Sequence, residues 1–494
     1  MKKLFSIILA VLTLISLCAC TDNPIIGDNE PSTDENGEAV IGIDTLKLPY
    51  SRTDSLNPFL AESSVNIQLM SLLYDGLYTL DKSYNPVPCI AESCIAGATA
   101  LNITLSPDAV FSDGTAITAQ DVVFSFNLAK SSPAYSSRLS NFTAANASSA
   151  NMLVMTLGSP DPYAAACLDF PVVKNFSEGD LPLGSGRYTV EKTQDTYYLV
   201  VNTKKTDFNP KIKTVKLVAV NDGVSLAGSL EIGNITVFCD DLSGGEYARI
   251  NAKTVEMGIN NLVFLAFNSK SELMACVPLR RAINLIINRT QLADTAFQGH
   301  ARIAYTPFNP DWEPLLTKDL VISRNPAGAQ TLIDESGYDI ASDNLSLLVN
   351  RDNPFKVEAA EFIAESLTAA GFDVTVRALG LDDYLQAVKD GEFDMYIGEI
   401  RLNNNMDLSA LMPGGSVSAG IPADCPSAAR YKQLLEGGCE LMDYINSFNE
   451  DLPFLPLCYR NAAVSYTNSL AGDYACCDSD IYSDIASWYF KGGE

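Results

Sequence analysis

Residues 344–400 decide the fold class, and they read NLSLLVNRDNPFKVEAAEFIAESLTAAGFDVTVRALGLDDYLQAVKDGEFDMYIGEI. Three short apolar runs within them predict strands, at Leu345–Val349, 372–376 and 394–400. Two longer stretches with apolar residues at helical spacing separate these runs. Strands that alternate with helices in this order predict a parallel sheet with helices on its faces, and hence an α/β fold.

The two connecting helices have recognisable ends. The first helix carries its apolar residues three or four positions apart, at Val357, Ala360, Ala364 and Leu367. Gly371 closes this helix, because glycine readily adopts the left-handed conformation that commonly ends helices. Asp382 is predicted to cap the second helix, and Gly391 to end it.

The first half of the chain has a different pattern. Between Leu101 and Asn202, short alternating strands are interrupted by Gly, Pro and Asp. Residues 131–150 are rich in Ser, Asn and Ala, and we expect them to form a polar excursion on the surface. The sequence therefore predicts one α/β lobe and a second lobe of mixed strands.

The N-terminus predicts export. Two lysines after Met1 precede an apolar run from Leu4 to Leu17, which is typical of a secretory signal peptide and too short for a stable membrane span. The run ends in Leu17-Cys18-Ala19-Cys20, which resembles the bacterial lipobox. This resemblance implies that residues 1–19 are removed and that Cys20 receives a diacylglyceryl group. We therefore expect a protein lipid-anchored to the outer face of the bacterial cell membrane; the alternative is a plain signal peptide with incidental cysteines.

Residues 20–40 are expected to form a spacer. They contain six acidic side chains and no Lys or Arg, and Pro24 and Pro31 disfavour a helix. So few large apolar residues cannot bury enough surface to offset the entropy lost on ordering. The stretch is therefore predicted to be a disordered tether between the lipidated cysteine and the folded part.

Charge and composition exclude several functions. The chain has a formal net charge of −27, so the phosphates of nucleic acids would repel it, and no nucleic-acid partner is predicted. It contains no Walker A motif, no C-x-x-C and a single histidine, so neither a cofactor nor a metal site is predicted. Ten of the 12 cysteines lie beyond Cys20, and the sequence leaves open whether they pair or pack as small core residues.

Three stretches carry a family resemblance. They are LYDGLYTLD (73–81), NPVPCIAES (85–93) and FSDGTAITAQDVVFSF (111–126). They resemble the motifs "YDGL..LD", "P.LAES" and "FSDGT.LTA.DV.FS" of extracellular solute-binding protein family 5, the peptide- and nickel-binding group. In the last motif, Asp113-Gly114 favours a tight turn, and Thr118 can form a capping box with the residue three positions later. The motif therefore indicates fold rather than ligand chemistry.

Weaker matches follow in the order of the family. They are LNP (56–58), GSGRY (184–188), FLAFN (264–268), LRRAIN (279–284) and DLPFLPL (451–457). The resemblance therefore runs from about Ile41 to near the C-terminus.

The resemblance implies a hinged two-lobed fold, periplasmic-binding-protein-like and of cluster C, that closes on a ligand. Lobe I would be discontinuous and comprise 41–267, with a mixed subdomain at about 73–169, and the return segment 456–494. Lobe II would comprise 268–455. The implied function is that of the substrate-binding lipoprotein of an ABC importer, which carries a small ligand, here a short peptide, to a membrane permease. Nickel held through a small chelator remains open.

The ligand is expected between the lobes, at the carboxyl ends of the lobe II strands. Peptide-binding members of the family place an aspartate against the α-ammonium group of the ligand in the segment after the third strand, and Asp407 is the nearest match. Members usually have proline after this aspartate, whereas this chain has Leu408. The alternative for Asp407 is a solvated loop or cap residue.

Four further residues are weaker candidates for the same cleft. Glu399 and Arg401 are two positions apart on a strand and therefore face the same side. They could contact a zwitterionic ligand or pair with each other. Arg187 and Tyr459 are candidates for the wall of the cleft.

An enzyme is not predicted. His300 is the only histidine, and no G-x-S-x-G elbow is present, so a hydrolytic triad lacks its usual signals. Two alternatives from other classes stay open, namely an extracellular hydrolase on a reused binding fold and a tethered sensory or adhesion module.

Overall fold

The structure is a computed structural model that describes residues 45–177, 179–220 and 225–491. The predicted signal peptide, the lipidation site Cys20 and the tether lie outside the described residues. Thr45–Tyr489 form one compact unit. The boundaries between the two lobes therefore stay predictions, and "lobe I" and "lobe II" denote below the described parts of the residue ranges predicted above.

The helices and strands follow one another along the chain with these bounds: β1 (Leu46–Ser51), α2 (Ser64–Leu73), β2 (Tyr78–Leu80), β3 (Pro86–Pro88), β4 (Ala91–Ala96), β5 (Ala100–Leu105), α3 (Ala119–Ala129), β6 (Phe142–Ala147), β7 (Met152–Leu157), β8 (Tyr188–Thr193), β9 (Thr196–Val201), β10 (Thr214–Val220), α4 (Leu226–Glu231), β11 (Val237–Asp240), β12 (Lys253–Phe267), α5 (Glu272–Ala275), α6 (Val277–Ile286), α7 (Arg289–Thr295), β13 (Ala301–Ile303), α8 (Glu313–Leu316), α9 (Pro326–Ser336), β14 (Asn344–Asn350), α10 (Pro354–Ala369), β15 (Asp373–Leu379), α11 (Leu381–Asp390), β16 (Met395–Arg401), α12 (Pro426–Leu435), α13 (Leu441–Asp451), β17 (Phe454–Tyr466), β18 (Leu470–Ala471) and β19 (Tyr489–Phe490).

The predicted strand–helix alternation is confirmed. Strand β14 pairs in parallel with both β15 and β16, and α10 and α11 pack against β14 and β15. The prediction of an Asp382 cap is wrong, because Gly380 is the N-cap of α11 and Asp382 lies in its first turn. The carboxylate of Asp352 accepts the N–H of Leu381 at 3.0 Å. A residue distant in sequence therefore supplies the hydrogen bond expected from the local cap.

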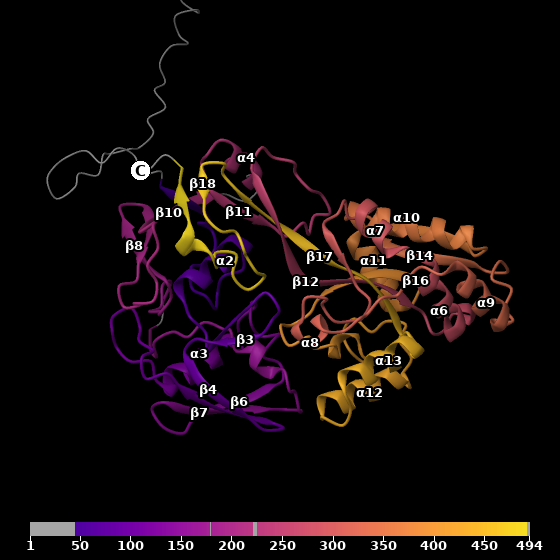
Figure 1. The fold of residues 1–494 in the computed structure, drawn as a ribbon, viewed down its shortest axis with the longest axis horizontal. Helices are drawn as coiled ribbons and strands as arrows, with labels where there is room; N and C mark the ends of the chain where they lie inside the picture. Colours follow the sequence, from indigo (N-terminus) through magenta and orange to yellow (C-terminus); the bar gives the residue numbers. More distant parts are fainter. Residues whose placement is uncertain (1–44, 178, 221–224, 492–494) are drawn as a thin grey trace, which may run out of the picture. The chain divides into compact units, whose positions relative to one another are not determined.

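A seven-stranded sheet runs through both predicted lobes. Its strand order is β11-β17-β12-β16-β14-β15, with β13 paired to β17. The two longest strands, β12 and β17, lie antiparallel and connect the elements around β10 and β18 with those around β14 and β16 (Figure 1). The pairing of β12 with β17 shifts register between Gly258 and Leu262. Such irregularities bend strands locally, so a bend in the crossing pair is expected at this point.

The core of this sheet depends on a close approach between neighbouring strands. Phe264 on β12 lies directly opposite Gly398 on β16, and a Cβ at Gly398 would come within 2.3 Å of the phenylalanine ring. The ring fills this space and packs edge-on against Tyr396 and Phe454, with ring centroids 5.9 and 5.5 Å away. Glycine at 398 is therefore required by packing, since interiors hold no space for an added side chain.

Lobe I contains the predicted mixed strands. One four-stranded sheet has the order β1-β10-β9-β8 and another β4-β5-β7-β6. The capping box at the start of α3, formed by Thr118 and Asp121, is confirmed. The prediction of a polar surface excursion at 131–150 is wrong in part, because the stretch contains β6, and Leu139 and Phe142 are buried. The polar composition of the stretch concealed these two anchoring side chains.

Two general features concern the described residues only. None of their helices is both long and apolar enough to cross a membrane. All ten cysteines among them are free thiols, and six of them are buried, such as Cys167 and Cys458 at 0% exposure. Burial of these thiols fits packing as small core residues, which is one of the two roles that the sequence leaves open.

Candidate functional site

Three side chains in the segment Arg401–Asn405, which begins at the last residue of β16, each donate to a carboxylate of lobe I. The pairs are Arg401–Asp478 at 2.6 Å, Asn404–Asp169 at 3.0 Å and Asn405–Asp161 at 2.7 Å. An aromatic contact accompanies them, since the rings of Tyr163 and Trp312 meet edge to face with centroids 4.7 Å apart. The segment in which the sequence predicts the ligand site therefore lies at the boundary between the two predicted lobes.

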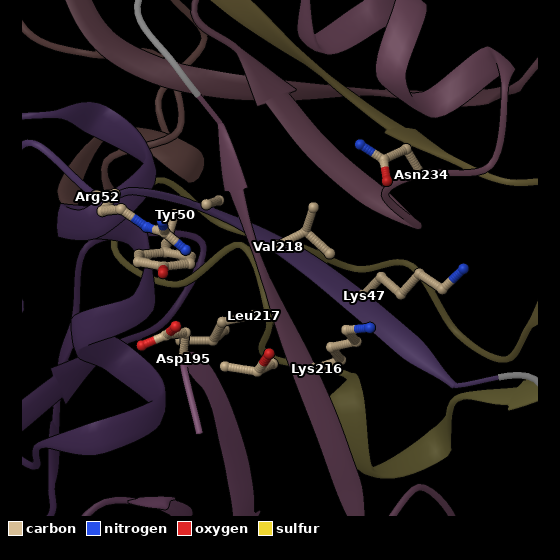
Figure 2. Close-up of a pocket in the computed structure, with 10 residues that line it drawn as sticks. Lys47, Tyr50, Arg52, Asp195, Lys216, Leu217, Val218 and Asn234 are labelled. Carbon is tan, nitrogen blue, oxygen red and sulfur yellow. The ribbon is translucent and has the colours of Figure 1, made fainter. Parts of the chain in front are cut away.

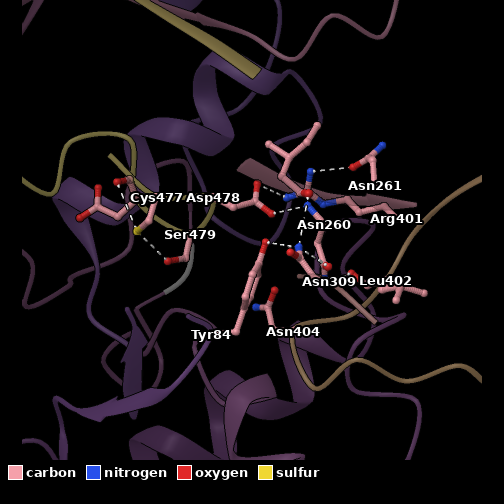
Figure 3. Close-up of polar contacts among 12 residues, drawn as sticks. Tyr84, Asn260, Asn261, Asn309, Arg401, Leu402, Asn404, Cys477, Asp478 and Ser479 are labelled. Atoms are coloured by element: carbon pink, nitrogen blue, oxygen red, sulfur yellow. Dashed lines mark hydrogen bonds and ion pairs between the residues drawn. The ribbon is translucent and has the colours of Figure 1, made fainter. Parts of the chain in front are cut away.

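Asp478 is the centre of the first contact (Figure 3). Its Oδ1 accepts from Arg401, and its Oδ2 accepts the backbone N–H of Asn260 at 3.1 Å. Asn260 lies within the register shift of β12, and its side-chain amide donates to the carbonyls of Leu402 and Asn403 at 3.0 and 3.1 Å. Asp478 therefore connects the crossing strand with the end of β16.

A small polar pocket lies beside this contact. Its volume is about 40 Å³, and it is lined by Asp81, Lys82, Tyr84, Met257, Gly258, Asp311, Cys476, Cys477, Asp478 and Ser479. The Tyr84 hydroxyl accepts from the Asn309 amide at 3.1 Å, and this amide also donates to Asn260 Oδ1 at 3.0 Å. Burial raises the pKa of Tyr84 well above its usual value, so the phenol stays protonated.

Glu399 does not face an open cleft. Lys356 and Arg460 hold its carboxylate at 2.7 and 2.6 Å, and Asn261 donates to it at 2.8 Å. Burial by itself would raise the pKa of Glu399, but the two cations overcome this effect and lower it to about 2. Glu399 and Arg401 also do not pair with each other, since each has other partners. The negative charge of Glu399 is thus neutralised by ion pairs within the protein.

Asp407 lies in a loop turn, and its side-chain hydrogen bonds to other described residues go to one carboxylate oxygen, Oδ1. Its Oδ1 accepts from the N–H and the hydroxyl of Ser409, at 2.9 and 2.6 Å, and from the Tyr431 hydroxyl at 3.2 Å. Met406 before it is buried and has a positive φ of 58°. The turn therefore resembles the cap considered as the alternative, and the ligand role of Asp407 stays a prediction.

Arg187 has a structural set of partners. It donates to the carbonyls of Ser71 and Tyr482 at 3.2 and 2.9 Å and forms an ion pair with Asp480 at 2.7 Å. Just before it, Gly186 passes so close to Leu73 that a Cβ would lie 2.3 Å from the backbone carbon. The two motifs GSGRY and LYDGL therefore pack on each other, which explains both without a ligand.

Tyr459 is fully buried on β17. Its hydroxyl donates to the carbonyl of Pro307 at 2.7 Å, and its side chain has 0% exposure. A side chain with no accessible surface cannot line an open wall in this conformation. The sequence predicts Arg187 and Tyr459 in the cleft wall from their position in the chain alone, whereas their contacts depend on residues far away in sequence.

The sequence profile of bacterial extracellular solute-binding proteins, family 5, matches residues 85–419. The chain belongs to this family. The family 5 chain is 20% identical over 543 residues to the oligopeptide-binding protein AppA of Bacillus subtilis (strain 168), with 99% of each protein covered. It is 22% identical over 371 residues to the nickel-binding protein NikA of Staphylococcus aureus (strain NCTC 8325 / PS 47), which covers 71% of this chain and 73% of that protein.

The fold of this family 5 chain is similar to solved structures. The ABC transporter substrate-binding protein CtaP of Listeria monocytogenes superposes with a TM-score of 0.71 at 17% identity, over 91% of this chain and 100% of that one. The predicted α/β two-lobed solute-binding fold is therefore confirmed. The two relatives named above are binding proteins.

His300 lies apart from the segment after β16. Its Nδ1 is 2.8 Å from a carboxylate oxygen of Glu256, and its ring packs on Tyr247 with centroids 4.3 Å apart. Within the described residues no group of three or more His, Cys, Asp or Glu side chains could hold a metal ion. The one histidine is thus placed in a side-chain contact at the crossing strands.

A second pocket of about 210 Å³ lies on the sheet of β1 and β10 (Figure 2). It is lined by Lys47, Tyr50, Arg52, Asp195, Thr196, Lys216, Leu217, Val218, Ala219 and Asn234. None of these residues belongs to the segment after β16 or to its lobe I partners. The pocket is therefore separate from the candidate ligand site of the family 5 chain.

Sequence reasoning missed the lobe I partners of the segment. The sequence around Asp161, Asp169 and Asp478 contains no motif that indicates a site. Asp478 follows Cys477 in the C-terminal stretch. Nothing in the spacing of these residues predicts that they meet. Only the asparagine run at 403–405 was a visible signal, because three consecutive amides are suited to several hydrogen bonds.

Proposed function

We propose that this chain is the substrate-binding subunit of an ABC importer that captures a short peptide between its two lobes. The observation that carries this proposal is the row of donors from Arg401 to Asn405, which meets three carboxylates of lobe I. Such contacts can form when the lobes close and separate when they open. They stabilise the closed form, and a ligand that contacts both lobes would add the differential affinity that drives closure.

Asp407 supports the choice of a peptide. It lies two residues after Asn405 in the same loop, with one oxygen held by Ser409 and Tyr431. A carboxylate oriented in this way can accept the α-ammonium group of a peptide. The match to the oligopeptide-binding relative covers 99% of the chain, which supports the same ligand class.

A nickel complex is the second candidate, favoured by the nickel-binding relative. The side chains of the described residues offer no group of three or more metal-binding types. Nickel would therefore have to arrive with its own small chelator, and the protein would recognise the chelator.

The proposed location and partners follow from the same role. The chain would be tethered by a lipid on Cys20 to the outer face of the bacterial cell membrane, where it delivers the ligand to the permease subunits. Two or three acyl chains give a lasting anchor, since each buried methylene contributes about 0.8 kcal/mol.

The experiment is a binding screen with the purified protein that starts at residue 21. Native mass spectrometry would first identify any ligand that co-purifies. Calorimetry would then compare di- to nonapeptides with Ni²⁺ plus L-histidine. Binding of one or more peptides with a defined stoichiometry supports the proposal, and binding of the nickel mixture alone would replace the peptide by a metal chelate. Binding of neither set would contradict the proposed function.

A further inference from the structure

Asp161 is a buried carboxylate with no cation beside it. The residue is 8% exposed, and its side chain accepts from the Asn405 amide at 2.7 Å and from the N–H of Tyr163 at 2.9 Å. Among the described residues it forms no ion pair. Burial raises the pKa of Asp161, and the nearby charge of Asp407 raises it further. A buried charge held only by neutral donors is costly, so the site lacks a positive group.

The two neighbouring contacts show what Asp161 lacks. Asp169 also accepts from an asparagine of the loop, but Arg138 lies 2.7 Å from it. Asp478 is held by Arg401 itself. Of the three lobe I carboxylates at this boundary, the two others each have an arginine. The need for a cation is therefore specific to Asp161.

A second observation points to the same place. The side-chain oxygen of Asn405 is buried and has no hydrogen-bond partner in the described structure, while its amide nitrogen donates to Asp161. Buried polar atoms are rarely left without a partner, and an orphan acceptor calls for a donor. Asp407 lies two residues further along the same loop. Tyr431 donates to Asp407, and the charges of both Asp407 and Asp161 raise the pKa of this tyrosine beyond the effect of burial.

We propose that Asp161 and Asp407 together bind a positively charged ammonium group of the ligand, with Asn405 Oδ1 as the third acceptor. The inference rests on the proposed function and adds a lobe I residue to the ligand site. An ammonium group has three N–H donors, which matches two carboxylates and one amide oxygen. A bare metal ion is a poorer match, since calcium takes six to eight oxygen ligands and these residues supply few.

The arrangement makes the ligand part of the contact between the lobes. Asp161 lies in lobe I, and Asn405 and Asp407 lie in lobe II. An ammonium group held by all three would be satisfied only when the lobes are together. Asp161 would therefore select ligands with a free amine and link their binding to closure.

The test compares trialanine with N-acetyl-trialanine by calorimetry. The variants are Asp161→Asn and Asn405→Ala, and Asn404→Ala is the matched control. Asn404 also donates to a lobe I carboxylate, but the charge of its partner Asp169 is already neutralised by Arg138. Thermal melting of the ligand-free proteins provides a readout that does not depend on the ligand.

Wild type should bind trialanine about tenfold or more tightly than the acetylated peptide. Asp161→Asn should lose most of this preference and weaken trialanine binding about tenfold, with little change for the acetylated form. Asn405→Ala should lower the preference, whereas Asn404→Ala should weaken both peptides by the same factor, because its contact with Asp169 supports closure and does not involve the ammonium group. Asp161→Asn should also melt at a higher temperature without ligand, because it removes an uncompensated buried charge.

The inference is wrong if Asp161→Asn binds both peptides as wild type does, or weakens both by the same factor. The second result would show a purely structural carboxyl. It is also wrong if wild type binds neither peptide. If wild type then binds another member of the ligand screen, the proposed function stands without this subsite; if it binds none, the proposed function fails as well.

Discussion

Arg401 and Asp478 are 77 residues apart in the chain, yet the guanidinium Nη2 lies 2.6 Å from the carboxylate Oδ1. The arginine ends β16, and the aspartate lies in the return segment to lobe I. The Arg401 side chain is 51% exposed and that of Asp478 8% exposed. The pair therefore combines a solvated cation with a shielded anion, and its contribution to closure should be modest and sensitive to salt.

Asp478→Asn should shift the protein towards its open form. The variant loses the ion pair but can still accept the N–H of Asn260, so its fold should be preserved. The ion pair should contribute about 1 kcal/mol to closure. Ligand affinity should therefore fall roughly fivefold, mainly through a faster off-rate. Small-angle scattering should give a larger radius of gyration for the variant at sub-saturating ligand.

Asp339→Asn is the control for this change of charge, because Asp339 is exposed and, among the described residues, its carboxylate accepts only the N–H of Ala341 in its own turn. Wild type should contract when a verified ligand saturates it. Closure would be refuted if wild type kept its radius of gyration at saturation. An Asp478→Asn variant with unchanged affinity would show that the ion pair does not contribute to closure.

Glu399→Gln should destabilise the fold rather than weaken binding directly. The substitution leaves Lys356 and Arg460 without their shared counterion, and the Arg460 side chain is only 4% exposed. Removal of one partner from a buried ion pair typically costs about 3–5 kcal/mol. Urea unfolding should show this loss. The control is Glu436→Gln, from an exposed pair with Lys432 at 3.8 Å, which should change the free energy of unfolding by less than about 0.5 kcal/mol.

The lowered pKa of Glu399 also predicts how the stability of the protein changes in acid. Its pKa of about 2 in the folded state lies below the ordinary value of 4.5, so the unfolded state binds more protons between these values. The stabilisation is fully present above about pH 5 and is lost as the pH falls towards 2. Unfolding measured across this range should show a flatter pH dependence in Glu399→Gln. Parallel curves for the variant and wild type would contradict the assignment.

Asp407→Asn should weaken the binding of a ligand that carries a free ammonium group. The variant can keep its hydrogen bonds to Ser409 and Tyr431 through Oδ1, so only the charge is lost. Removing one partner of such a pair typically costs about 2–5 kcal/mol, mainly in the off-rate. Calorimetry with trialanine measures the effect, and Asp424→Asn, an exposed lobe II residue, is the control. Equal affinity of Asp407→Asn and wild type would leave Asp407 as a cap alone.

Cys20→Ala should abolish lipid attachment. The prediction depends on Leu17-Cys18-Ala19-Cys20, in which only Cys20 follows a small residue at the end of the apolar run. Cells fed radioactive palmitate should label the wild-type protein, whereas Cys20→Ala should be unlabelled and released from the membrane. Cys18→Ala should label as wild type does. Label on the Cys20 variant would show that the acyl chain is attached elsewhere.

The sequence predicted the elements whose causes are local. The order β14, α10, β15, α11 and β16 follows from apolar periodicity, and the capping box of Thr118 and Asp121 needs only four consecutive residues. The motifs of family 5 were recognisable for the same reason, since they record turns and caps. The location of the candidate site after β16 also followed from the sequence, because ligands bind at the carboxyl ends of parallel strands.

The roles of individual charges were decided by tertiary structure. Glu399 and Arg401 share one strand and one face, yet Lys356 and Arg460 hold the first and Asp478 holds the second. The strength of a charged contact depends on distance and burial, and neither can be calculated before the chain is folded. The sequence thus determined the strands and helices of residues 344–400 and the capping box of α3, whereas the fold alone brought Asp161 beside Asn405 and left that carboxylate without a cation among the described residues.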